Sequence, residues 1–338
     1  MKTHRKSRIG LVIALAVALL SFVPLAGQSR TAATKAGAAP ATTWQTPWGD
    51  PDLQGTWTNA TNTPLQRPAK YGLREFLTAE EKAAVKDLYT AEEKPDSDNP
   101  RAAVDRNERG ATPEEDLAGA YNKFWFEERP TDGRTSLVID PPDGRIPMTP
   151  AGQKRRAAFG DTEGTDSWES RSLYDRCIIR NPLPRTPTSY NNNYEIVQTP
   201  GYVAILQEIM HETRLIPLDG RPHLDSSLRQ WLGDSRGHWE GNTLVVETTN
   251  FSDRTDFEGA GPHMRLVERW TRLADDRIDY RFTVEDSTAW TRPWSAAIAW
   301  NKVGPIFEYA CHEGNYSLYN ILEGARVSEA EEAAKRAK

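Results

Sequence analysis

The sequence predicts a mainly β protein, in which an antiparallel meander forms either a strongly curved sheet or a closed barrel, with helical elaborations near the N-terminus. From residue 194 onward, runs of five to nine residues alternate between apolar and polar side chains and are separated by turn residues, which is typical of antiparallel strands. Helix-capping patterns occur earlier, before residue 160. A series of hairpins must also protect its edge strands, and closure into a barrel does so.

Residues 1–27 have the layout of a secretory signal peptide. Four basic side chains precede an apolar run from Ile9 to Ala26, which ends near Pro24 and small residues. An uncleaved membrane anchor is the alternative interpretation. We therefore expect a periplasmic or secreted protein that keeps no stable membrane span after signal cleavage.

Composition and charge exclude several classes of protein. The chain has 338 residues, of which 38% are hydrophobic and two are cysteine, unlike an integral membrane bundle or a disulfide-rich scaffold. Residues 1–27 carry four basic and no acidic side chains, so their removal takes the net charge from −6 to about −10. Such a surface repels phosphate backbones, and nucleic acid is not expected as a partner. The oligomeric state is not predicted.

We expect one folded domain after the signal peptide. Residues 28–50 predict a flexible linker, and residues 51–325 predict a single β-rich domain with a helical insert at about 74–160. Residues 326–338 predict a polar, solvated tail. The first strand is expected within Asp52–Thr58.

Three helix starts are predicted inside the insert. Thr78 and Glu81 form a capping box. Thr112 precedes a proline at the first helical position, and Thr149 likewise precedes Pro150. The second helix has an apolar face that must pack against another part of the protein, formed by Leu117, Tyr121, Phe124 and Trp125.

At least seven strands are expected in the second half of the chain. The clearest is Arg277–Glu285, which forms a hairpin with the preceding residues 264–273. A strand entered through a Gly-Asn turn is predicted within Trp239–Phe251. The remaining strands are predicted at residues 194–197, 202–217, 294–300 and 305–311.

Four sequence blocks resemble the recurring blocks of a family of exported bacterial proteins of unknown function. They are PWGDPDLQGTW (47–57), DGRPH (219–223), WEGNTLVVETTNF (239–251) and EYACHEGN (308–315). This resemblance covers most of the mature chain and implies no activity. The Gly-x-Trp of residues 55–57 is also similar to the first-strand motif of lipocalin-type barrels, which implies a lipocalin-like barrel. The long helical insert departs from that pattern.

Alternation places some charged side chains on apolar faces. Glu268 shares a face with Met264, Leu266 and Trp270, and is expected to be a buried carboxylate that needs a partner. In the run 202–216, Glu208 and Arg214 fall on one face and could form an inward ion pair. The alternative is an edge strand or a one-residue shift, which exchanges the two faces.

Other polar side chains are candidates for a site. His211, His263 and His312 are candidate acid–base groups, because histidine titrates near neutral pH. Arg221 and His223 lie in a turn and could meet an anionic or hydroxylated ligand, although such a turn also forms for structural reasons. No compact metal-ligand spacing, nucleotide loop or serine-nucleophile elbow is present, so no cofactor is expected.

The cysteines are candidates for a disulfide, and the aromatic side chains are candidates for ligand contacts. Cys177 and Cys311 either form one long-range disulfide in an oxidising compartment or remain two buried thiols. Six of the eleven tryptophans lie in the strand-rich half, where they either line a pocket or fill a broad core. Trp270, Tyr280 and Tyr309 are the candidate aromatic ligand contacts.

The sequence therefore predicts an exported barrel with an aromatic-lined pocket for a small phenolic, sugar or terpenoid-like molecule. One alternative is a cofactor-free acid–base enzyme of the lyase, isomerase or hydrolase type. There, Glu268 or a histidine would act as base, and Arg214 or Arg221 would hold developing negative charge. A structural interaction module of the cell envelope is the other alternative.

Overall fold

A computed structural model describes residues 44–92, 129–160, 164–180, 182–188 and 190–337. The chain divides into two units, Met1–Ala41 and Thr42–Lys338, and the second unit contains all the described residues. The predicted signal peptide, most of the predicted linker and the helix predicted from Thr112 lie outside the described residues. Residues 44–50 of the linker are described, and they form turns with a β-bridge between Gln45 and Pro51.

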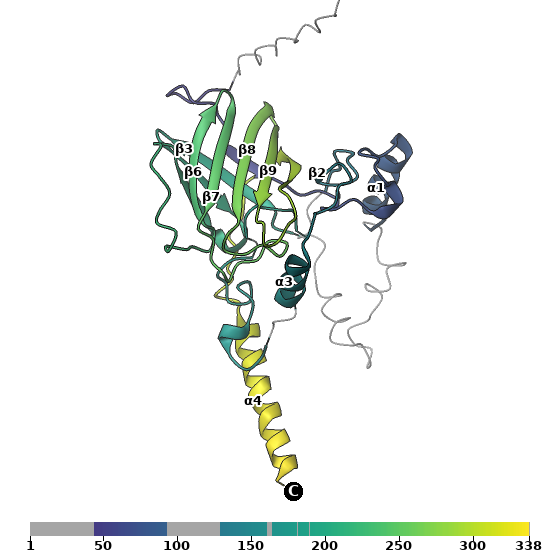
Figure 1. Ribbon diagram of the computed structural model, residues 1–338, viewed down its shortest axis with the longest axis vertical. Helices are drawn as coiled ribbons and strands as arrows, with labels where there is room; N and C mark the ends of the chain where they lie inside the picture. The colour runs from purple at the N-terminus through teal and green to yellow at the C-terminus, as the bar shows by residue number, and fades with distance from the viewer. Residues whose placement is uncertain (1–43, 93–128, 161–163, 181, 189, 338) are drawn as a thin grey trace, which may run out of the picture. The chain divides into compact units, whose positions relative to one another are not determined.

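The protein is mainly β, as predicted, and its antiparallel strands form a ten-stranded sheet that nearly closes into a barrel. Strands β6 to β9 lie side by side in sequence order (Figure 1). The ten strands are β1 (Gly55–Thr58), β2 (Val138–Asp140), β3 (Asn193–Thr199), β4 (Tyr202–Gln207), β5 (Thr213–Pro217), β6 (Asp234–Glu240), β7 (Thr243–Thr249), β8 (Arg265–Ala274), β9 (Arg277–Glu285) and β10 (Trp294–Lys302).

The strand order is β5-β4-β3-β1-β10-β9-β8-β7-β6, with β2 paired to β10. The hairpins expected from the sequence are present, but the first strand lies between β3 and β10, which no local pattern shows. Strands β5 and β6 stand at the two ends of this order and meet through side chains. A Cβ atom added to Gly237 on β6 would lie 2.8 Å from the Ile216 side chain on β5. We call this contact between β5 and β6 the seam.

Two expected strands differ from the prediction. The run predicted over 202–217 is two strands, β4 and β5, separated by the short 3-10 helix η4 (Ile209–His211), in which Met210 and His211 have positive φ angles of 62° and 42°. The strand predicted over 305–311 is wrong, because that segment has no regular secondary structure. The strand predicted within Trp239–Phe251 covers β7 but only Trp239 and Glu240 of β6.

The helices confirm two of the predicted starts. Helix α1 (Ala79–Glu92) follows the capping box, in which the Thr78 amide donates to Glu81 Oε2 over 2.8 Å and the Glu81 amide donates to Thr78 Oγ1 over 3.2 Å. Helix α3 (Pro150–Gly160) begins after Thr149. Two more 3-10 helices and a long C-terminal helix complete the described elements: η1 (Ala69–Tyr71), η3 (Trp168–Ser170) and α4 (Tyr316–Arg336).

Helix α4 has no fully buried residue and includes most of the predicted polar tail, which is exposed but helical. Within the described part of the chain, no helix combines the length and the apolar character needed to cross a membrane.

The barrel interior is packed with aromatic side chains that the strand alternation directs inward. Trp270 stacks on Tyr280 with ring centroids 4.9 Å apart, and Tyr194 stacks on Trp300 at 4.5 Å. Each such pair contributes about 0.5–1.5 kcal/mol beyond the burial of its area. The tryptophans therefore fill much of the core, as one of the two sequence interpretations expected.

Candidate ligand-binding site

A buried ion pair crosses the barrel interior between β5 and β8. The Arg214 guanidinium donates from Nη2 to Glu268 Oε2 over 2.5 Å. Glu268 is 0% exposed and Arg214 is 7% exposed. Tyr280 on β9, also fully buried, donates its hydroxyl to the other carboxylate oxygen of Glu268 over 2.8 Å. The prediction that Glu268 is a buried carboxylate with a partner is confirmed.

Two hydroxyls also accept hydrogen bonds from Arg214. Its Nε atom donates to Ser235 Oγ on β6 over 2.9 Å, and its Nη2 atom donates to Thr248 Oγ1 on β7 over 2.7 Å. The two hydroxyl oxygens lie 3.0 Å apart. Arg214 therefore connects β5 to β6 across the seam, where the barrel is held by side chains. We call Arg214, Ser235, Thr248, Glu268 and Tyr280 the interior polar cluster.

Burial and the nearby carboxylate both act on the Tyr280 hydroxyl. Burial raises the pKa of Tyr280 well above its ordinary value of 10, and the negative charge of Glu268 and its hydrogen bond raise it further. Tyr280 is therefore a neutral donor at physiological pH. Each carboxylate oxygen of Glu268 accepts one hydrogen bond and keeps one further acceptor position.

Three members of the interior polar cluster, Arg214, Glu268 and Tyr280, line a small cavity beside aromatic side chains of the core. The space that a water-sized sphere can enter is about 10 Å³, enough for about one water molecule. Gln207 on β4 is 3% exposed, and its side-chain amide makes none of the hydrogen bonds found among the described residues. The full lining consists of Leu183, Arg185, Tyr194, Ile205, Gln207, Arg214, Glu268, Trp270, Tyr280 and Trp300.

Two of the tryptophans that line this cavity have unsatisfied indole groups. The Nε1 atoms of Trp270 and Trp300 are buried and have no hydrogen-bond partner, and each of these residues is 1% exposed. A buried polar group left without a partner costs about 1–3 kcal/mol, and native proteins contain few of them. Two residues of the cavity wall therefore carry polar groups that bond to no described residue.

A loop segment contributes to the cavity wall beside the strands. We call the described residues 177–180 and 182–188 the strap. Its Leu183 is 1% exposed and belongs to the main hydrophobic core. Arg185 donates to Glu212 Oε2 over 2.7 Å, and the Asn59 side chain donates to the Arg185 carbonyl oxygen over 3.1 Å. Leu183 and Arg185 thus form the part of the cavity wall that lies outside the strands.

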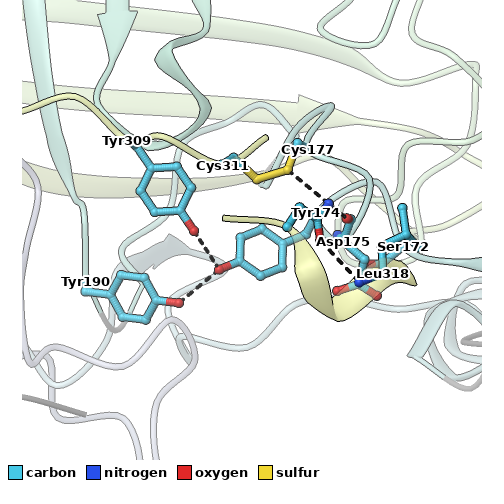
Figure 2. The surroundings of a disulfide bond; sticks show 9 residues. Ser172, Tyr174, Asp175, Cys177, Tyr190, Tyr309, Cys311 and Leu318 are labelled. Carbon is cyan, nitrogen blue, oxygen red and sulfur yellow. Dashed lines mark hydrogen bonds between the residues drawn. A yellow bond between two sulfur atoms is a disulfide. The ribbon is translucent and has the colours of Figure 1, made fainter. Parts of the chain in front are cut away.

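A disulfide and a group of tyrosines fix the base of the strap. Cys177 and Cys311 form the long-range disulfide, with a Cα–Cα distance of 5.8 Å. Figure 2 shows the hydroxyls of Tyr190 and Tyr309 meeting that of Tyr174, at 3.0 Å and 3.1 Å respectively. Burial raises the pKa of the Tyr174 hydroxyl. Tyr309, expected as a ligand contact, lies in this group and not in the cavity wall.

The structure corrects the expected partner of Arg214. Glu208 was placed on the same face of one continuous strand, but η4 interrupts that strand and directs Glu208 elsewhere. Its carboxylate accepts hydrogen bonds from the Asn193 side chain over 2.8 Å and from the Phe307 amide over 2.9 Å. Glu208 therefore fastens the C-terminal segment to β3 and takes no part in the cavity.

The histidines and Arg221 do not join the cavity. His211, His263 and His312 are exposed, and none of them lines it. His223 places Nδ1 2.9 Å from Asp234 Oδ2. Arg221 is exposed, pairs with Asp219 and donates to the Tyr202 hydroxyl over 2.9 Å. The cavity thus brings together four of the predicted site residues, Arg214, Glu268, Trp270 and Tyr280.

Sequence reasoning missed several members of the site. Alternation along β4 places Gln207 on the same face as Val203 and Ile205, and alternation along β7 places Thr248 with Leu244 and Val246, so both carried a readable signal. The strap carried none, because its position depends on contacts with distant residues. Among the described residues, no three His, Cys, Asp or Glu side chains are arranged to hold a metal ion.

No protein-family model matches this chain, and no curated protein matches it significantly.

Proposed function

We propose that this protein is exported and that its barrel binds a small molecule in the cavity beside Arg214 and Glu268. The observation that carries the proposal is a set of buried polar groups around this cavity whose hydrogen-bonding capacity is only partly used. The fold of this barrel, with its aromatic core, fits a ligand-binding barrel.

The energetics support a role for this site beyond folding. A buried ion pair is weak evidence for stability, because well-packed apolar side chains of similar volume are often as stabilising or more so. The indole groups of Trp270 and Trp300 add the cost of two unpaired donors. Binding sites commonly carry such costs, because their polar groups are arranged for a ligand.

The size of the cavity sets a condition on binding. Space for about one water molecule does not accommodate a sugar or a phenol. Leu183 is the apolar part of the strap that fills the adjacent core, so its displacement is the direct way to enlarge the cavity. The apparent affinity for the ligand is then the affinity of the open form multiplied by the fraction of molecules in which the strap is open.

Export is supported by the signal-like residues 1–27 and by the disulfide, since disulfides persist in oxidising compartments. Cell fractionation and N-terminal sequencing of the mature protein test this part. An intact N-terminus on a cytoplasmic protein contradicts it.

A fluorescence titration tests binding. Saturable quenching or a spectral shift is expected with at least one member of a library of phenolics, sugars, lipids and small organic acids, because Trp270 and Trp300 line the cavity. Leu183→Ala is expected to tighten that binding, whereas Leu228→Ala, at an exposed leucine, is the matched control and leaves it unchanged. If no probe changes the fluorescence of the wild-type protein, the proposed function is wrong.

A further inference from the structure

The open polar groups of the cavity are mainly hydrogen-bond donors. Nη1 of Arg214 takes part in none of the hydrogen bonds of the interior polar cluster. Trp270 and Trp300 each carry an indole N–H without a partner, and an indole can only donate. Gln207 contributes one amide group that donates and one carbonyl oxygen that accepts. Donors therefore outnumber open acceptors.

The acceptors of the site already accept some hydrogen bonds. Glu268 accepts from Arg214 on one oxygen and from Tyr280 on the other, which uses about two of its four acceptor positions. The hydroxyls of Ser235 and Thr248 both accept from Arg214 and also contact each other. The open N–H groups remain more numerous than the open acceptor positions, and a ligand rich in acceptors would satisfy them.

Charge around the cavity is balanced, so the open donors decide the class of ligand. Two guanidinium groups, those of Arg185 and Arg214, line the cavity. Each is paired with one carboxylate, Arg185 with Glu212 over 2.7 Å and Arg214 with Glu268 over 2.5 Å. An anion that enters the cavity therefore meets no net charge from these two pairs, and its acceptor positions can take the open N–H groups.

We infer that the ligand of this cavity is a small carboxylate. This inference rests on the proposed function of the cavity as a binding site. A carboxylate has two oxygens with about four acceptor positions and no donor, and its hydrogen bonds to N–H groups are charge-assisted. An alcohol or a sugar brings a donor with each hydroxyl, and an ammonium brings donors only. The flat faces of Trp270 and Trp300 favour an aromatic or conjugated group beside the carboxylate.

The test compares three probes of nearly equal shape: benzoate, benzyl alcohol and benzylammonium. Binding is measured by tryptophan fluorescence and by calorimetry, in a carboxylate-free buffer at constant ionic strength. Benzoate is expected to bind at least tenfold more tightly than benzyl alcohol, with no binding of benzylammonium. The same series with acetate, ethanol and ethylammonium tests the carboxylate without the ring.

Two variants of Gln207 test whether benzoate binds in the cavity beside this residue. Gln207→Glu keeps the size of the side chain and adds a negative charge, so benzoate affinity is expected to fall at least tenfold. Gln207→Met removes both amide groups without adding charge and is expected to weaken benzoate several-fold, which keeps the test available if the first variant fails to fold. Gln230→Glu makes the same chemical change at an exposed residue and leaves benzoate affinity unchanged.

The outcomes separate this inference from the proposed function. If benzyl alcohol or benzylammonium binds as tightly as benzoate, or if both Gln207 variants bind benzoate normally, the inference is wrong while the barrel remains a ligand-binding protein. If neither these probes nor the wider library bind the wild-type protein, the cavity holds only a water molecule. In that case the carboxylate inference and the proposed binding function are both wrong.

Discussion

Removing the negative charge from the interior polar cluster is expected to be strongly destabilising. In the Glu268→Gln variant the Tyr280 hydroxyl still has an acceptor, but the buried Arg214 loses its counter-charge. Breaking a buried pair from one side costs about 3–5 kcal/mol. A separate calculation agrees, because opposite charges roughly 4 Å apart attract by about 4 kcal/mol at an effective dielectric constant of about 20. We therefore expect the free energy of unfolding to fall by about 3–5 kcal/mol.

Urea unfolding of the oxidised protein, followed by far-ultraviolet circular dichroism, measures this loss. With a slope of about 3 kcal/mol per molar urea, the midpoint shifts by about 1 M or more. Adding Arg214→Met to Glu268→Gln is expected to restore part of the stability, because no buried charge remains. The matched control is Glu240→Gln, which breaks the exposed pair with Arg269 and costs at most about 1 kcal/mol.

The reasoning is refuted by either of two results. A loss below about 1 kcal/mol for Glu268→Gln means that Arg214 gains solvent or another partner when the carboxylate is removed. A double variant that is destabilised by the full sum of the two single losses means that the pair is not energetically coupled.

Three further predictions concern the seam, pH and the disulfide. Gly237→Ala inserts a methyl group against β5 and is expected to cost about 1–3 kcal/mol in urea unfolding; an unchanged midpoint means that the seam opens freely. The raised pKa of Tyr280 contributes stability that is complete below the unfolded value of about 10 and is lost as pH rises through the folded value, so Tyr280→Phe should flatten the decline in unfolding midpoint above about pH 10; equal slopes contradict this. Reduction of Cys177–Cys311, whose sequence separation is 134, should cost about 3–5 kcal/mol relative to the oxidised protein, and equal midpoints contradict it.

The alternation of side chains was sufficient to predict the inward position of Glu268, because β8 is a regular strand from Arg265 to Ala274. The same reasoning failed for the partner of Arg214. The segment between β4 and β5 contains Met210 and His211 with positive φ angles, and this turn ends the period-two relationship between Glu208 and Arg214. A pattern read across such a turn relates residues that no longer share a face.

The other errors have a different physical origin. Residues 305–311 alternate as a strand does, yet strand pairing requires a neighbour, and Phe307 instead donates its amide to the Glu208 carboxylate. The insertion of β1 between β3 and β10 also depends on contacts distant in sequence. Local patterns therefore predicted the inward side chains of regular strands, and tertiary contacts decided the closure of the barrel and the cover of its cavity.

The disulfide connects the proposed export of the protein to the closed form of its cavity. Cys177 lies at the start of the strap, and Tyr190 lies just beyond its end. The disulfide joins Cys177 to Cys311, and the hydroxyl of Tyr174 links that of Tyr190 to that of Tyr309. Both ends of the strap are thereby attached to the same short C-terminal segment (Figure 2). Because this attachment limits how far the strap can move in the folded protein, oxidation favours the form in which Leu183 closes the cavity. Reduction should therefore raise both the fraction of open strap and the apparent affinity of a ligand that must displace Leu183, provided that the protein remains folded.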